Sequence, residues 1–142
     1  MKYLKRIFES LDKDELQDFC EMNLAYLLDN EDFSIDIEYF DDLIGQYLVV
    51  IKLVKMVELS AGGRMTTMYQ WQEVKDYIVP FIVQLNKNYS LNTTWNDNKG
   101  SITIRQEQEW RNFSYEKFMR VVDNWYEDDD EIRYIEIILD NK

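Results

Sequence analysis

The chain has 142 residues, of which 46 % are hydrophobic and 15 % aromatic, a composition typical of one folded domain with a substantial core rather than of a disordered segment. Its 28 acidic and 16 basic residues give a formal net charge of −12, which repels nucleic acids and anionic membranes and attracts basic proteins. The chain has no histidine, which excludes the commonest general base and zinc sites. It has one cysteine, which excludes an internal disulfide.

The chain contains neither a membrane-spanning apolar run nor the pattern of a secretory signal at Met1–Ser10. We therefore predict a single cytoplasmic domain over residues 1–142, with no catalytic residues, no metal and no cofactor. Expected partners are a basic host protein or a nucleic-acid-binding protein, not nucleic acid itself and not a membrane.

A helix followed by a strand is predicted in the first third of the chain. Asp12 precedes Glu15 by three residues, a spacing typical of helix N-termini. Apolar residues then recur at helical spacing, and these are Leu16, Phe19, Cys20, Leu24, Leu27 and Leu28. Cys20 lies within this stripe, so we interpret it as a packing residue rather than a nucleophile. From Phe33 to Phe40 apolar and polar residues alternate, which indicates a strand with one solvated face.

The middle of the chain is predicted to form a buried strand and then the longest helix. Residues Tyr47 to Leu59 contain an unbroken apolar run, typical of a strand near the centre of a sheet. The helix is expected from Thr67 to Lys87, because Thr67 and Gln70 have the spacing of a capping box. Pro80 removes one backbone hydrogen bond at a cost of roughly 3 kcal/mol, so we expect a bend in one continuous helix. The apolar stripe of this helix comprises Trp71, Val74, Ile78, Phe81, Ile82 and Leu85.

The last third is predicted to form a hairpin, a helix and a final strand. Residues alternate in 89–95 and again in 101–108, with the turn sequence NDNKG between them. Ser114 has the place of an N-cap, with Phe113 and Phe118 spaced as a hydrophobic staple. The final strand is expected from Ile132 to Leu139.

The predicted order, αββ, αββ, αβ, indicates an α+β fold, with an antiparallel sheet of about five strands and helices on one face. Two arrangements fit, a ferredoxin-like sheet or a repeat of αββ units, and the place of the 33–40 strand decides between them. The edge strands of such a sheet present unpaired backbone groups, so we also predict a homodimer.

One candidate site for a small anionic or nucleotide ligand lies in the segment between the buried strand and the long helix. Two glycines, an arginine and two hydroxyls there would lie at a helix N-terminus, whose amides and dipole favour anions. The segment has neither the lysine nor the spacing of a phosphate-binding loop of the Walker type, so a plain connector is the competing interpretation. The residues are Gly62, Gly63, Arg64, Thr66 and Thr67.

A second candidate site, for a protein partner, consists of an exposed tryptophan and an acidic run. Trp110 ends the polar stretch QEQE, which suggests that its ring is exposed. The acidic run does not have the spacing of a calcium loop, so it is either a solvated loop or a surface for a basic partner. Its residues are Glu127, Asp128, Asp129, Asp130 and Glu131. Further acids at 12–21 and 29–42 would add to such a surface if the fold brings them to one face.

The opening MKYLKRIFESLD resembles the start of small uncharacterised tailed-bacteriophage proteins. That resemblance implies a phage origin and therefore the host cytosol as the place of action. Combined with the acidic composition, it predicts a non-enzymatic inhibitor or anti-defence protein that docks on a basic host or defence protein, for example by mimicking the charge of nucleic acid. The alternatives are a protein that sequesters a small anionic ligand at the Gly62-Gly63 loop and a virion component.

Overall fold

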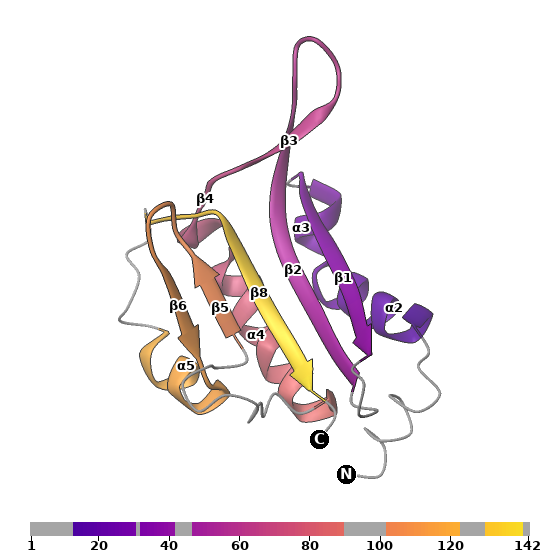
Figure 1. Ribbon diagram of the computed structural model, residues 1–142, viewed down its shortest axis with the longest axis vertical. Helices are drawn as coiled ribbons and strands as arrows, with labels where there is room; N and C mark the ends of the chain where they lie inside the picture. The colour runs from indigo at the N-terminus through magenta and orange to yellow at the C-terminus, as the bar shows by residue number, and fades with distance from the viewer. Residues whose placement is uncertain (1–12, 31, 42–46, 90–101, 123–129, 141–142) are drawn as a thin grey trace.

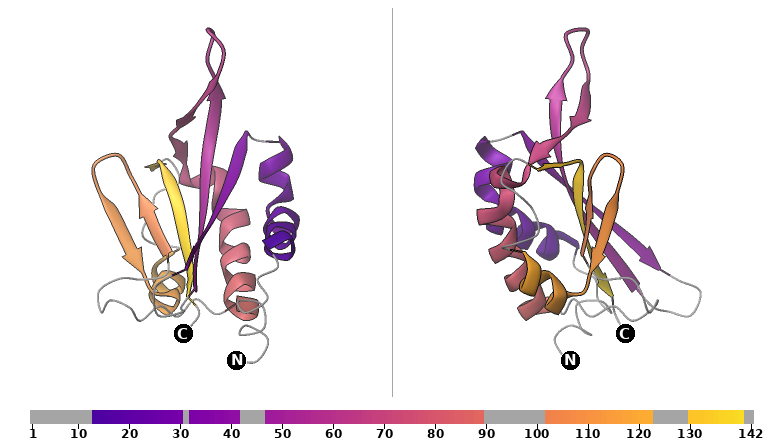
Figure 2. Two further views of the ribbon diagram at one scale, coloured as in Figure 1. Left: turned by 45° about the vertical axis from the view of Figure 1, so that its right-hand side comes forward. Right: turned by 90° about the vertical axis from the view of Figure 1, so that its left-hand side faces the viewer.

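The computed structural model describes residues 13–30, 32–41, 47–89, 102–122 and 130–140. Its elements form two layers, an antiparallel sheet and a set of helices on one face of that sheet (Figure 1 and Figure 2). The helices are α2 (Lys13–Asn23), α3 (Ala25–Asn30), α4 (Trp71–Tyr89) and α5 (Tyr115–Val121). The strands are β1 (Phe33–Asp41), β2 (Tyr47–Glu58), β3 (Arg64–Thr67), β4 (Tyr69–Gln70), β5 (Ile102–Arg105), β6 (Trp110–Phe113), β7 (Glu131–Ile132) and β8 (Tyr134–Asp140). The predicted α+β architecture is confirmed.

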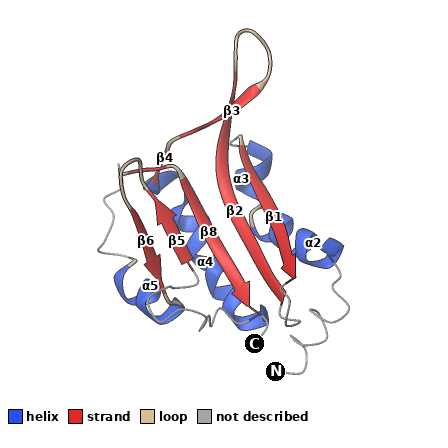
Figure 3. Ribbon diagram, viewed as in Figure 1, coloured by secondary structure: helices blue, strands red, loops and turns tan. Residues whose placement is uncertain are grey.

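The main sheet has the strand order β1-β2-β8-β5-β6, and β3 pairs with the outer part of β2. The last strand, β8, therefore lies at the centre, between the hairpins β1-β2 and β5-β6 (Figure 3). In a ferredoxin-like sheet β2 would have β8 and β6 as its neighbours. Here β1 occupies the second side of β2 and β6 lies at the opposite edge, so the strand order is not ferredoxin-like.

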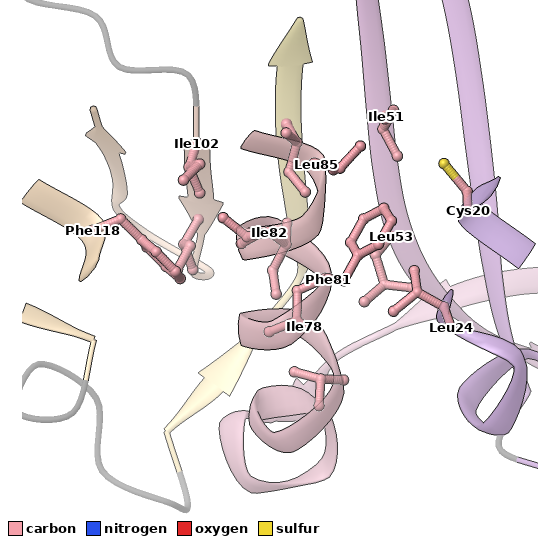
Figure 4. Packing of buried hydrophobic residues seen from close by; sticks show 14 of the residues in the cluster. Cys20, Leu24, Ile51, Leu53, Ile78, Phe81, Ile82, Leu85, Ile102 and Phe118 are labelled. Carbon is pink, nitrogen blue, oxygen red and sulfur yellow. The ribbon is translucent and has the colours of Figure 1, made fainter. Parts of the chain in front are cut away.

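Helix α4 lies at the centre of the helical layer and supplies the largest share of the core. Its predicted apolar stripe is confirmed, because every member is at most 2 % exposed, namely Trp71, Val74, Ile78, Phe81, Ile82 and Leu85. Four members of this stripe, Ile78, Phe81, Ile82 and Leu85, are seen in Figure 4 between the strand residues Ile51 and Ile102, with Leu24 on one side and Phe118 on the other. Pro80 is exposed, and α4 continues through it as one helix, as predicted.

The predicted start of this helix at Thr67 is wrong. Thr67 pairs with Lys55 in the β2-β3 hairpin, so its backbone belongs to a strand. The helix begins at Trp71, and Glu73 completes the cap by accepting a hydrogen bond from the Gln70 amide through Oε2 at 2.7 Å. The Trp71 amide is the first of the helix and has no acceptor in a preceding turn, and it donates to the backbone oxygen of Asp130 at 2.9 Å.

The segment expected to connect β2 directly to the helix is instead the tip of a β-hairpin. The Gly62 amide donates to the Leu59 oxygen and the Leu59 amide to the Gly63 oxygen, both at 3.0 Å, which closes a three-residue turn. Gly62 and Gly63 have φ angles of 92° and 85°, in the region that favours glycine. The hairpin formed by β3 and the end of β2 extends beyond the rest of the sheet (Figure 1).

The C-terminal elements confirm one prediction and correct another. Ser114 is the N-cap of α5, with its Oγ accepting from the Lys117 amide at 3.2 Å, and the Phe113 and Phe118 rings meet edge to face at 6.0 Å, as the staple predicted. The predicted hairpin between 89–95 and 101–108 is wrong, because it requires β5 to pair with 89–95. β5 instead pairs with β6 on one side and with β8 on the other. Residues 90–101 lie outside the described ranges, and Tyr89 is the last residue of α4.

Candidate functional site

The negative charge of the chain is concentrated in the first described segment. Its described residues, 13–30 and 32–41, contain nine acidic residues and one lysine, a net charge of −8, which is two thirds of the total of −12. These residues form α2, α3 and β1. Because β1 is an edge strand and α3 contacts it, the segment makes up one side of the molecule, at the right in Figure 1. We call this side the acidic edge.

Helical periodicity explains why the acids of α2 and α3 face solvent. Leu16, Cys20, Leu24 and Leu27 are at most 3 % exposed and pack into the core, so the opposite face of the helix points outward. The helix predicted here is divided by a turn at Leu24 into α2 and α3, although the hydrogen bonds from Leu24 to Cys20 and from Leu28 to Leu24 keep helical spacing. The acids of the edge with described side chains are all exposed, namely Asp14, Glu15, Asp18, Glu21, Asp29, Asp32, Asp36 and Glu38.

The spacing of the acids along α2 approaches that of a nucleic-acid strand. Four of them fall between Asp14 and Glu21. At a rise of about 1.5 Å per residue this gives one negative charge per about 3 Å of helix axis, against about 3.4 Å per phosphate in one strand of DNA. The sequence alone indicated these acids but not their common side, which depends on how α2 and α3 pack beside β1.

Two exposed apolar side chains accompany the acids on α2 and α3. Met22 is 73 % exposed and Tyr26 is 51 % exposed, and they stand four residues apart. The Tyr26 ring stacks on the Tyr77 ring of α4, with centroids 4.9 Å apart and 12° between the planes. Sequence reasoning missed both residues, although their position outside the buried stripe was visible in the helical spacing. Apolar groups surrounded by charged ones are the usual composition of a protein interface.

Of the residues predicted to bind a partner, the structure describes Trp110, Asp130 and Glu131. Trp110 is 54 % exposed, as expected, but it lies on β6, at the opposite edge of the sheet from β1. Glu131 pairs with Gln70 between β7 and β4, and the Asp130 oxygen caps α4, so this end of the acidic run stabilises the start of a helix. The other predicted residues, Glu127, Asp128 and Asp129, lie outside the described ranges.

The predicted ligand site also loses its structural basis. Gly62, Gly63 and Arg64 lie at the hairpin tip, and Thr66 and Thr67 lie on β3, with β4 between them and the start of α4. A helix N-terminus therefore supplies neither amides nor a dipole to this segment. Arg64 was the only cation expected to attract the anion, and it is paired in register with Glu58 across the hairpin. The negative charge of Glu58 directly opposite Arg64 opposes binding of an anion there.

Cys20 has the environment of a packing residue. Its side chain is buried, and this burial raises the pKa of the thiol to about 12, with a smaller contribution from the charge of Glu21. A thiol with so high a pKa is a poor nucleophile at neutral pH. Among the described residues no three acidic or cysteine side chains gather closely enough to hold a metal ion. Within the same ranges no helix has both the length and the apolar character needed to cross a membrane.

Comparison with known proteins gives no assignment, since no protein-family model, curated protein or solved structure matches the chain.

Proposed function

We propose that this chain is a non-catalytic binding protein whose acidic edge docks on a basic protein, in particular on one that binds nucleic acid. The observation that carries the proposal is the set of exposed acids that α2, α3 and β1 bring to one edge of the fold, those of the helices on the helical layer and Asp36 and Glu38 on the opposite face of the sheet. The described residues of that edge, 13–30 and 32–41, carry a net charge of −8 within 28 residues. A basic partner is attracted to this edge because it carries two thirds of the net charge of the chain.

Charge and apolar contact have separate roles in this proposal. Exposed charges mainly accelerate encounter and exclude wrong partners, and at physiological salt they act over a distance of about 8 Å. Affinity then depends on side chains that lose contact with water in the complex. Met22 and Tyr26 are the exposed apolar groups in the middle of the α2-α3 surface, and the stack on Tyr77 holds the Tyr26 ring in place. We therefore assign the apolar centre of the interface to these two residues.

The charge spacing of α2 suggests how the partner would be inhibited. A surface that binds DNA is adapted to one negative charge per about 3.4 Å along each strand, and α2 offers about one per 3 Å. A partner that accepts α2 in its groove cannot hold nucleic acid there at the same time. The proposed consequence is competition, in which DNA and this protein displace each other from the partner.

The experiment compares two variants of equal net charge. The edge variant neutralises four acids of α2, through Asp14→Asn, Glu15→Gln, Asp18→Asn and Glu21→Gln. The control variant neutralises four exposed acids outside the edge, through Glu58→Gln, Glu107→Gln, Glu116→Gln and Glu131→Gln. Each immobilised protein captures partners from host lysate at low and at high salt, with and without competing DNA, and thermal melts confirm that each variant is folded.

The proposal predicts that wild type and the control variant capture a basic protein that salt and DNA displace, whereas the edge variant loses most of it. Equal losses in both variants would show that net charge matters and the edge does not. Capture of an acidic protein without salt dependence would contradict the proposal as well.

A further inference from the structure

The outer side of β1 is an edge of the sheet within the described part of the chain. β1 is nine residues long and pairs there with one strand, β2. The Met56 amide donates to the Asp32 oxygen at 3.0 Å, which identifies the pair of residues 32 and 56 as a hydrogen-bonded pair of the ladder. Because such pairs alternate along antiparallel strands, even-numbered residues of β1 bond to β2. The backbone groups of Phe33, Ile35 and Ile37 therefore point away from the sheet.

The two faces of β1 differ in chemistry. Ile35, Ile37 and Tyr39 lie on the side of the helices, where they are half-buried and pack against the core. Asp36 and Glu38 lie on the other face and are exposed. A strand laid along the outer side of β1 would thus have apolar neighbours on one face and carboxylates on the other, because side chains of paired strands share a face.

We propose that the outer edge of β1 accepts an extended basic segment of the partner as an added strand. This inference rests on the proposed function, since it specifies how a basic partner engages the acidic edge. The added segment alternates apolar residues, which contact Ile35 and Ile37, with lysine or arginine, which faces Asp36 and Glu38. Backbone hydrogen bonds to the outward groups of β1 hold the segment, and the alternating side chains select it.

Charge argues against a second copy of this chain as the occupant. Antiparallel pairing of β1 with itself around Ile37 would place Asp36 of one copy opposite Glu38 of the other, and like charges directly opposite each other are destabilising. A basic strand reverses the sign of that interaction. The homodimer predicted from the sequence stays a prediction, and β6, whose four residues include no acid, is the edge better suited to it.

The test uses three synthetic nine-residue peptides of alternating lysine and valine. The first is unmodified, the second carries N-methyl groups on the valines, and the third carries them on the lysines. In an added antiparallel strand only the valine amides face β1, since valines share the helix-side face with Ile35 and Ile37. Methylation of the valines should weaken binding by at least about tenfold, and methylation of the lysines, whose amides face solvent, should have little effect. A parallel strand gives the opposite preference.

A protein variant provides the second measurement. Ile37→Pro removes an amide that points outward and is not needed by β2, so the edge strand should tolerate it, which a thermal melt checks. The variant should lose binding of the unmodified peptide by at least about tenfold. Self-association of the wild-type protein that Ile37→Pro abolishes would instead assign the edge to a second copy and overturn the proposal.

The outcomes separate this proposal from the proposed function. If all three peptides bind alike and the edge variant weakens all of them, the acidic edge binds by charge alone and strand addition is overturned. If no peptide binds, strand addition is overturned. Capture of a basic protein by the acidic edge is then still tested separately by the comparison of the edge and control variants. Strand addition is supported when one methylated peptide loses binding and the other does not.

Discussion

Glu73 joins the start of α4 to the base of the projecting hairpin, and its replacement by alanine should cost about 2 kcal/mol of unfolding free energy. One carboxylate oxygen accepts from the Gln70 amide and the other from Lys55 Nζ, each at 2.7 Å. The cap contributes about 1 kcal/mol, and the charge at a helix N-terminus about 0.3–1 kcal/mol. The pair with Lys55 contributes about 0.2–1 kcal/mol, because both side chains are about a quarter exposed, at 23 % and 28 %.

The assay is urea denaturation at neutral pH of wild type and Glu73→Ala, with Glu73→Gln as the matched control. The glutamine oxygen can still accept from the Gln70 amide but carries no charge, so this variant should lose about half as much stability. A double-mutant cycle with Lys55→Met isolates the ion pair, for which we expect a coupling of about 0.5 kcal/mol. A total loss in Glu73→Ala below about 0.5 kcal/mol, the range of ordinary surface changes, would refute the reasoning.

Three further predictions concern stability. Burial raises the pKa of Cys20 from 9.0 to about 12, so the neutral thiol stabilises the native state below pH 9, and this contribution is lost as the pH rises towards 12. The difference in melting temperature between wild type and Cys20→Ala should therefore shrink between pH 9 and pH 12. A difference that stays constant over this range would contradict the prediction. Pro80→Ala should raise the unfolding free energy by about 1–3 kcal/mol, since it restores an amide in an exposed helical position, and a destabilised variant would argue against it. Gly62→Ala should lower the unfolding free energy by about 1 kcal/mol. The cost comes from the φ of 92° alone, because no atom lies within 4 Å of an added Cβ. An unchanged denaturation midpoint would disprove this.

The features that sequence predicted correctly are those specified by neighbouring residues. The stripe of α4 follows from apolar residues three and four positions apart, and the packing of so many of them outweighs the lost hydrogen bond at Pro80. The cap at Ser114 with its Phe113–Phe118 staple is likewise complete within five residues. Such signals survive folding because tertiary contacts reinforce them.

The features that sequence missed depend on contacts between distant segments. The 60–67 segment has two glycines and polar residues, typical of a connector, but β2 is long enough to pair with Arg64–Thr67 and turns it into a strand. The four residues of β6 show no clear alternation, and their strand character comes from pairing with β5. The central place of β8 required a choice among sheet orders that local patterns do not make.

The acidic edge shows the same division. Sequence identified the acids at 12–21 and 29–42 and stated the condition that they reach one face. The structure places the described ones along one edge, because α3 packs on β1 and β1 is an edge strand, but Asp36 and Glu38 lie on the face of the sheet opposite the helices. Trp110 was correctly expected to be exposed, yet the strand order places it across the sheet from these acids.

The most direct test of the acidic edge as the docking surface is hydrogen–deuterium exchange of the protein with and without its captured basic partner. Backbone amides in α2, α3 and β1 should become protected in the complex, with the largest change around Met22 and Tyr26 and along β1. The hairpin tip at Gly62 and strand β6 at Trp110 should exchange as in the free protein. Protection confined to the hairpin or to β6, with α2, α3 and β1 unchanged, would contradict the account.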